Sequence, residues 1–155
     1  LQEALRVPVA TSSLMQVPMV QSLLPKDRRV GILTISEATL TDKHLTAAGV
    51  PQDTPIQGTD DGQEFTRAIL GNEESLDVDR ARQDNVTFAL KLMKDHPDLG
   101  AIVLECTNMV PYAADIRAAT GLPVYSIYSF VTWFQAGLQP RTFEDPFLDG
   151  KPIRY

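Results

Sequence analysis

Short runs of β-branched and apolar residues alternate with stretches of helical periodicity along almost the whole chain. This alternation predicts parallel strands that are joined by crossover helices, an arrangement found in α/β sheets. The most apolar run, Ala101–Leu104, is typical of a strand that is buried on both faces of a sheet. The expected strands are Val7–Ala10, Val30–Ile35, Thr54–Gln57, Ala101–Leu104 and Val124–Ile127.

Residues that favour helix ends flank the segments between these strands. Asp77 is a good N-terminal cap for a long helix that reaches His96, and Gly49 and Gly121 are typical residues just after a helix. Expected helices cover about 14–24, 41–48, 64–70, 78–96, 111–119 and 130–138. The sequence therefore predicts an α/β fold, a parallel sheet of about five strands with helices on both faces, and an irregular tail at 139–155.

Composition excludes several classes of partner. Fourteen Lys and Arg stand against twenty Asp and Glu, a formal net charge of −6, and neither sign forms a run. We therefore expect no nucleic acid and no acidic membrane surface as partner. The apolar runs are far shorter than the roughly 20 residues of a membrane-spanning helix. A single cysteine and the lack of an export signal favour a reducing, cytoplasmic location.

Polar residues follow several of the expected strands. In a parallel sheet with helices on both faces, ligands bind beyond the carboxyl ends of the strands, so these residues are the place to look for a site. They are Thr11, Ser12 and Ser13; Thr34 and Ser36; Gly58 to Asp61; Glu105 to Asn108; and Ser126 to Tyr128.

Cys106 comes just after the most apolar strand and just before an expected helix. A helix N-terminus favours a thiolate, and the backbone N–H groups of Thr107 and Asn108 are donors for a carboxylate. Cys106 is thus a candidate acid or base beside an anion site. The alternative is a small buried apolar residue, because free cysteines are often buried.

Other polar residues favour structural roles. His44 and His96 lie in or at the end of helices, and Asp60 and Asp61 are interpreted as helix caps, so no metal site is predicted. No glycine-rich phosphate loop follows a strand, which argues against nucleotides. Strand alternation turns Glu105 away from the face of Cys106, so a hydrogen bond or ion pair is favoured over acid catalysis.

Several segments resemble the aspartate/glutamate/hydantoin racemase superfamily. Ala101–Tyr112, Ala118–Val124 and the helix Trp133–Leu138 are similar to that family's second cysteine region, with Cys106-Thr107-Asn108 the most specific element. Pro8–Leu14 and Arg29–Thr34 look like the end of the first lobe and the opening strand of the second. The resemblance covers Val7 to Leu138.

The resemblance implies one complete lobe of a two-lobe, cofactor-independent enzyme that holds a substrate carboxylate between its lobes. It implies that Cys106 is the second-lobe acid/base and that Thr107 and Asn108 bind the carboxylate. It also places Thr11, Ser12, Ser13, Thr34 and Ser36 near the substrate. The chain departs from the family in two ways: Asn108 stands where glutamate racemases often have His, and a first cysteine is absent.

These features together predict an isomerase, an amino-acid racemase-like enzyme that moves a proton at the carbon α to the carboxylate of a small acid. The alternatives are a decarboxylase of the same superfamily, a non-catalytic module that binds small acids, or an inactive fragment. The expected domains are 1–28, a remnant of the first lobe; 29–138, the second lobe; and 139–155, a tail. The opening Leu1-Gln2-Glu3 suggests a piece of a longer protein, and exposed apolar surface would favour a homo-oligomer.

Overall fold

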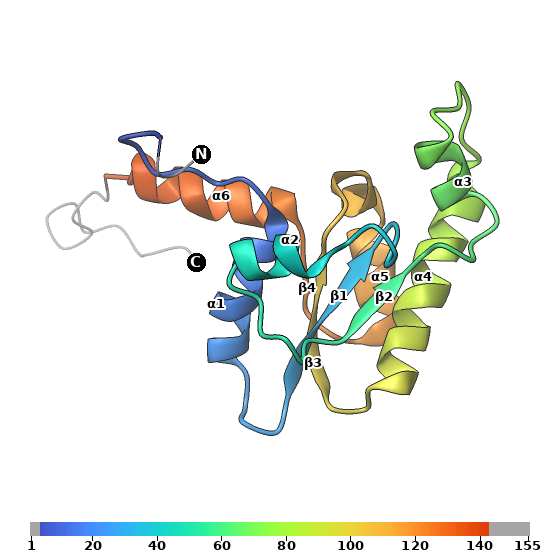
Figure 1. Cartoon of the computed structure of the whole chain (residues 1–155), viewed down its shortest axis with the longest axis horizontal. Coiled ribbons are helices and arrows are strands. Elements are labelled where there is room, and N and C mark those ends of the chain that lie inside the picture. Colours follow the sequence, from blue (N-terminus) through green and yellow to red (C-terminus); the bar gives the residue numbers. More distant parts are fainter. Residues whose placement is uncertain (1–3, 143–155) are drawn as a thin grey trace, which may run out of the picture.

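A four-stranded parallel sheet forms the centre of the computed structural model, which describes residues 4–142 (Figure 1). The strands lie in the order β2-β1-β3-β4. They are β1 (Arg29–Thr34), β2 (Ile56–Gly58), β3 (Leu99–Leu104) and β4 (Val124–Tyr125). The expected α/β class with a parallel sheet is therefore confirmed, with β1 and β3 as its two central strands.

Helices and short 3₁₀ segments connect the strands. They are η1 (Ser13–Met15), α1 (Gln16–Leu23), α2 (Asp42–Ala47), α3 (Phe65–Leu70), α4 (Val78–Asp95), η2 (Thr107–Tyr112), α5 (Ala113–Thr120) and α6 (Ile127–Leu138). Asp77 caps α4 by accepting from the N–H groups of Asp79 and Arg80, as its sequence position predicts. Gly121 ends α5 in the left-handed conformation, with φ of 71°.

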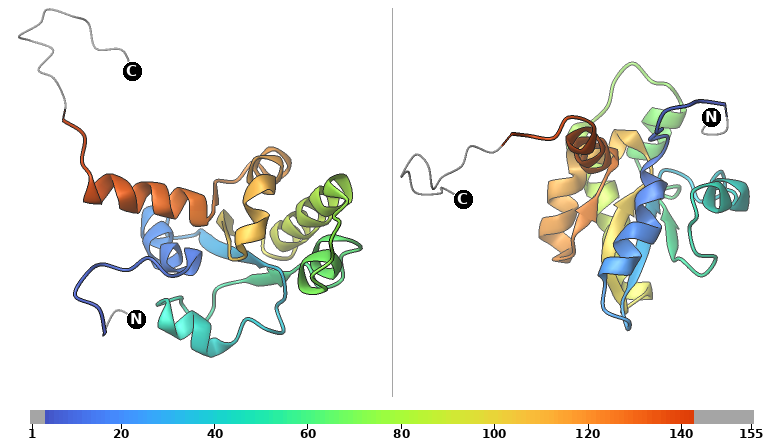
Figure 2. Two further views of the ribbon diagram at one scale, coloured as in Figure 1. Left: turned by 90° about the horizontal axis from the view of Figure 1, so that it is seen from above. Right: turned by 90° about the vertical axis from the view of Figure 1, so that its left-hand side faces the viewer.

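Each central strand sends alternate side chains to opposite faces of the sheet. Val30 and Ile32 of β1 pack beneath η1, α1 and α2, whereas Leu33 packs against α3, α4 and α5 on the other face. The same alternation holds in β3, where Val103 and Leu104 belong to different core clusters. The helices accordingly cover both faces of the sheet, as the views in Figure 2 show.

The prediction of a strand at Val7–Ala10 is wrong. Residues 7–10 form neither strand nor helix, and the side chain of Val7 is 62% exposed. Pro8 has no N–H group to donate to a ladder, and β1 and β3 already have partners on both sides. The sheet accordingly has four strands within the described residues, and the segment before η1 lies along α6 (Figure 1).

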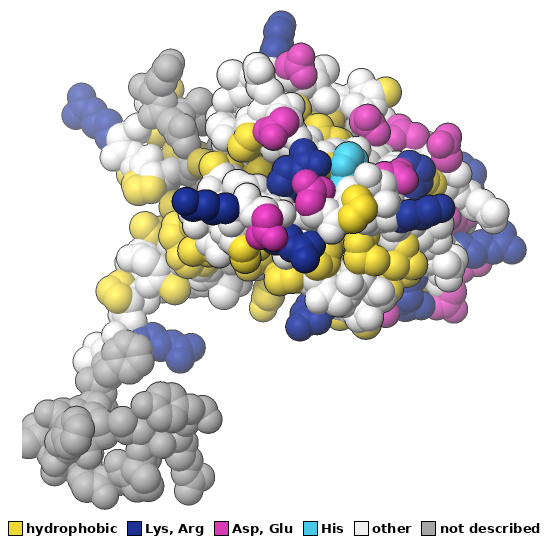
Figure 3. All heavy atoms as spheres, turned by 90° about the horizontal axis from the view of Figure 1, so that it is seen from below, with side chains coloured by type: hydrophobic (Ala, Val, Ile, Leu, Met, Phe, Trp, Pro, Cys, Tyr) yellow, Lys and Arg dark blue, Asp and Glu magenta, His cyan; other side chains and the backbone are white. Residues whose placement is uncertain are grey.

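The outer surface agrees with the charge pattern of the sequence. On the face seen from below, acidic and basic side chains are interspersed, and neither sign forms a patch (Figure 3). None of the helices within residues 4–142 is long and apolar enough to cross a membrane.

The predicted domain boundaries and tail stay predictions. η1 and α1, although predicted to derive from a first lobe, pack on the same sheet as the rest of the chain. Residues 139–142 of the predicted tail have no regular structure, and residues 1–3 and 143–155 lie outside the described part of the chain.

Candidate functional site

The strand order reverses between β1 and β3. The chain passes from β1 to β2 on one side, and then crosses over β1 to β3 on the other. Such a switch point leaves a crevice at the carboxyl ends of the two strands, where ligands bind in open α/β sheets. A cavity of about 690 Å³ lies at this point, bounded by the ends of β1 and β3, by η1 and by α2. Its volume is in the range of small-molecule sites.

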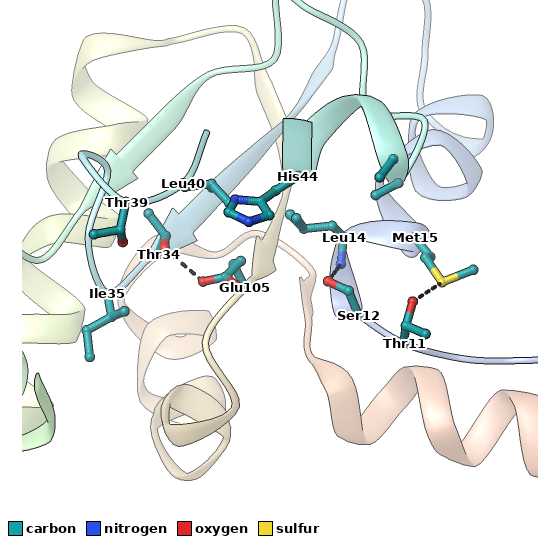
Figure 4. A pocket seen from close by; sticks show the side chains of 12 residues that line it. Thr11, Ser12, Leu14, Met15, Thr34, Ile35, Thr39, Leu40, His44 and Glu105 are labelled. Atoms are coloured by element: carbon teal, nitrogen blue, oxygen red, sulfur yellow. Dashed lines mark hydrogen bonds between the residues drawn. The ribbon is translucent and has the colours of Figure 1, made fainter. Parts of the chain in front are cut away.

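A hydrogen bond between the ends of the two central strands forms the floor of this cavity (Figure 4). Thr34 Oγ1 donates to Glu105 Oε2 at 2.8 Å. The Glu105 N–H continues the ladder by donating to the Leu33 carbonyl at 2.9 Å. Thr34 is buried and Glu105 is half-buried. The carboxylate is consequently held at a fixed place on the cavity wall.

Two of the polar residues before the first helix also line the cavity. Ser12 Oγ accepts from the Leu14 N–H at 3.2 Å and so caps η1. Thr11 Oγ1 donates to the Met15 sulfur at 3.4 Å. The structure thus brings Thr11 and Ser12, predicted from sequence, to the same cavity as Thr34, across 23 residues of chain.

Ser13 and Ser36 do not line this cavity. Ser13 is 1% exposed, and its hydroxyl donates to the carbonyls of Leu104 at 2.6 Å and Glu105 at 3.2 Å. Ser36 is 4% exposed, and its carbonyl accepts from Thr39 Oγ1. Ser13 therefore ties the N-terminal segment to the end of β3, directly before Cys106.

Cys106 lies at the start of η2 and is not among the residues that line the cavity; it packs against the core cluster on the face of the sheet that α3, α4 and α5 cover. It is half-buried and free of disulfide bonding, while Thr107 and Asn108 are exposed. Met109 behind them is fully buried and anchors this segment in the core. The predicted site residues thus fall into two neighbouring groups, one around Glu105 and one around Cys106.

The protonation state of Cys106 differs from the expectation of a stabilised thiolate. Burial raises the pKa of the thiol, and the negative charge of Glu105 raises it further. The backbone N–H groups of Asn108 and Met109 act in the opposite direction but do not outweigh burial. The protonated thiol is therefore the main form near neutral pH.

Two polar residues of the cavity wall, Thr39 and His44, are not predicted from the sequence to lie at a site. Glu105 is among the residues after a strand where a site is expected, and its predicted hydrogen bond is confirmed. His44 caps α2 by accepting from the Thr41 N–H at 3.2 Å, and its ring also lines the cavity, as does Thr39. Of these three residues, Glu105 alone has a sequence signal for a site, because it directly follows a central strand.

The caps assigned to Asp60 and Asp61 need correction. Asp60 accepts from the N–H of Glu37 at 2.9 Å rather than capping a helix. The N-terminus of α3 is instead held by Asp84 of α4. Within residues 4–142 there is no group of three or more His, Cys, Asp or Glu side chains that could hold a metal ion.

An apolar hollow of about 440 Å³ lies between α6 and the segment before η1. Its walls include Phe130, Trp133 and Phe134, whose helical spacing in the sequence predicts a place in the core. Phe130 is buried, but Trp133 is 57% exposed, so the prediction is wrong for the tryptophan. Figure 1 shows the reason, since α6 extends beyond the edge of the sheet, which leaves part of its surface uncovered by the sheet.

Comparisons of sequence find similarity to lyases. The chain is 33% identical over 136 residues to a dimethylsulfoniopropionate lyase of Durusdinium sp. clade D, a match that covers 84% of this chain and 44% of that protein. It is 32% identical over 128 residues to dimethylsulfoniopropionate lyase 6 of Emiliania huxleyi (strain CCMP1516), with 76% of this chain and 33% of that protein covered. The chain thus spans less than half the length of these relatives. No family model matches it.

Comparison of structures finds the fold of a racemase. An allantoin racemase from Pseudomonas fluorescens superposes with a TM-score of 0.62 at 18% identity, covering 91% of this chain and 63% of that one. The expectation of a racemase-like α/β lobe is therefore confirmed at the level of the fold.

The expectation of an isomerase is wrong. The curated relatives are named lyases, and their identity of about one third extends over most of the chain. The fold by itself does not distinguish a proton transfer that inverts a carbon centre from one that starts an elimination, since both remove a proton beside a carboxylate.

Proposed function

We propose that this chain carries the Cys106 part of the active site of a lyase that acts on a small carboxylic acid with a leaving group on its β carbon. Dimethylsulfoniopropionate is the substrate that the comparisons favour. The observation that carries the proposal is the 33% identity to a dimethylsulfoniopropionate lyase across 84% of the chain. Membership of the aspartate/glutamate/hydantoin racemase superfamily is part of this proposal, and the racemase-like fold supports it.

The reaction is an elimination. A base removes a proton from C2 of the propionate, and the electron pair of that C–H bond forms the C2–C3 double bond. The C3–S bond breaks, and its electron pair stays on sulfur. The products are acrylate, neutral dimethyl sulfide and the proton on the base. The step leaves no net oxidation or reduction to be balanced by a cofactor.

Cys106 is the base in this proposal. Its position at the end of a central strand is where open α/β sheets present reacting groups. The exposed Thr107 and Asn108 are the proposed partners of the substrate carboxylate, through the Thr107 N–H and the hydroxyl and amide groups of the two side chains. The Ser13 hydroxyl holds the backbone before Cys106 in place, because it donates to the carbonyls of Leu104 and Glu105.

The raised pKa of Cys106 sets the expected pH dependence. Proton removal needs the thiolate, which is the minor form near neutral pH because burial raises the thiol pKa. A thiolate of raised pKa is also a stronger base toward a C–H proton. The rate should therefore increase with pH until the thiol has ionised.

The test measures dimethyl sulfide in the headspace and acrylate in solution, using the complete gene product that contains these residues. We expect equal amounts of the two products, and a loss of at least about a hundredfold in rate for Cys106→Ala and for Cys106→Ser. Thr87→Ala, at an exposed position on α4, is the matched control. Absence of dimethyl sulfide, or undiminished release by both Cys106 variants, would contradict the proposal.

A second candidate is a module that binds small acids without turnover. The protonated, half-buried thiol favours it, because a resting thiol is a poor base. Binding of the substrate without product, and without deuterium uptake at C2 in heavy water, would support this module over the lyase.

A further inference from the structure

The switch-point cavity contains a carboxylate that is not neutralised by a basic side chain. Among the ion pairs of residues 4–142, none includes Glu105. Its side-chain partner is the neutral hydroxyl of Thr34. Within the described part of the chain, no Lys or Arg lines the cavity, and His44 is its one other ionisable residue. The cavity is therefore suited to a positive charge and unsuited to an anion.

The rest of the wall is largely apolar. Besides the hydroxyl residues, the cavity is lined by aliphatic and thioether side chains. These are Leu14, Met15, Ile35, Leu40, Ala47 and Ala48. A fully methylated cation has no hydrogen to donate, so it needs apolar contacts for its methyl groups and a carboxylate for its charge. The wall supplies both within one space.

We infer that Glu105 binds the onium group of the substrate, so that the cavity selects β-onio carboxylic acids such as sulfonium and quaternary ammonium compounds. The inference rests on the proposed function, because it assigns one end of that substrate to the cavity. Glu105 is here a specificity residue, since it contacts the leaving group and takes no proton.

The same charge sets the direction of binding. Glu105 repels the carboxylate end of the substrate, which is then directed away from the cavity toward Thr107 and Asn108. Glu105 and Cys106 are neighbours in the chain, and strand alternation turns their side chains apart. The onium group and the reacting C2 of one short substrate therefore have separate partners. Acrylate carries no positive charge, so the attraction to Glu105 is lost once the C–S bond has broken.

The experiment compares two ligands of the same shape, neither of which carries the dimethylsulfonium leaving group. 3-(Trimethylammonio)propionate carries a positive charge, and 4,4-dimethylpentanoate has a carbon atom in place of the nitrogen. Calorimetric titration of the complete gene product should give an affinity about tenfold higher for the cation. In Glu105→Gln this preference should disappear. Glutamine can still accept from Thr34, so the variant keeps the local hydrogen bond, and thermal unfolding checks its fold.

Glu74→Gln is the matched control, because it removes one exposed negative charge away from the cavity. The ratio of affinities should stay at the wild-type value in this variant. Equal affinity for both ligands in the wild type, a preference that survives in Glu105→Gln, or no binding of either ligand would each overturn the inference.

The outcome is separable from that of the proposed function. Neither ligand contains sulfur, so a preference for the cation that depends on Glu105 is measured independently of dimethyl sulfide release from dimethylsulfoniopropionate. In the opposite case, release of dimethyl sulfide without such a preference would leave the lyase standing and remove the role of Glu105.

Discussion

Individual residues at the ends of β1 and β3 decide what the proposed site can do. Thr34 fixes the Glu105 carboxylate on one side of the strand end, and Cys106 lies at the start of η2 on the other. The charge of Glu105 is also one cause of the raised pKa of the thiol. The two neighbours are therefore electrostatically coupled, and a cation bound at Glu105 should favour the thiolate of Cys106.

The thiol of Cys106 should react slowly with iodoacetamide near neutral pH. The thiolate is the reacting form, and burial raises the pKa of the thiol. The rate should therefore reach half of its maximum at a pH above the ordinary cysteine pKa of about 8.5. The same chain unfolded in urea is the control. A half-maximal rate below that of the unfolded chain would contradict this assignment.

The same shift has a consequence for stability. The folded chain prefers the protonated thiol, so the contribution of Cys106 is fully present below the ordinary pKa of cysteine. It is lost as the pH increases from there through the raised pKa. Cys106→Ala should lack this alkaline decrease in the free energy of unfolding.

At the scale of elements, the packing of α3 on α4 depends on one buried carboxylate. Asp84 of α4 accepts from the N–H groups of Gln63 at 3.1 Å, Glu64 at 2.7 Å and Phe65 at 2.9 Å. These groups at the start of α3 have no acceptor within their own helix. The segment between β2 and α4 is thereby held beside the sheet, where Phe65 enters the core.

Asp84→Ala should lower the free energy of unfolding by about 2–3 kcal/mol, because it leaves buried N–H groups without an acceptor. Urea denaturation of the purified variant is the measurement. Asp79→Ala is the control, since Asp79 lies on the same helix and is 88% exposed in its side chain. A loss below about 0.5 kcal/mol in Asp84→Ala would show that water satisfies these groups.

At the scale of the whole molecule, four of the large exposed apolar side chains within residues 4–142 lie on one projecting helix. α6 carries Tyr128, Val131, Trp133 and Leu138, each of which is 48% exposed or more. Exposed apolar area of this kind favours association in water. It is the surface that would support the homo-oligomer expected from the sequence.

We expect the chain to self-associate through α6 as its concentration increases. Trp133 is the only tryptophan, so its fluorescence emission should move to shorter wavelength on association. Val131→Lys should weaken association by about tenfold, measured by sedimentation, because it places a charge in the apolar contact. Leu70→Lys is the control, at an exposed apolar position on α3. A concentration-independent monomer would contradict the expectation.

The amino-acid sequence by itself determined the class of fold and the edge of the sheet that carries the candidate site. Val30–Ile35 and Ala101–Leu104 could be predicted as strands because burial on both faces requires continuous apolar sequence. Asp77 and Gly121 could be predicted as helix ends because the unpaired backbone groups there need a capping side chain or a left-handed residue. Each of these signals is local, lying within a few residues of the element it describes.

Only the tertiary structure decided which of the polar residues at that edge line the cavity and which are buried outside it. From the sequence, Ser13 is expected near the substrate. In the structure its hydroxyl donates to the carbonyl of Leu104, 91 residues further along the chain. Val7–Ala10 has the composition of a strand but lies along α6 and is not part of the sheet. Glu105 lines a cavity because the strand order reverses between β1 and β3, which leaves a crevice at the carboxyl ends of these two strands. Contacts between distant segments set these outcomes, and the spacing of residues along the chain carries no record of them.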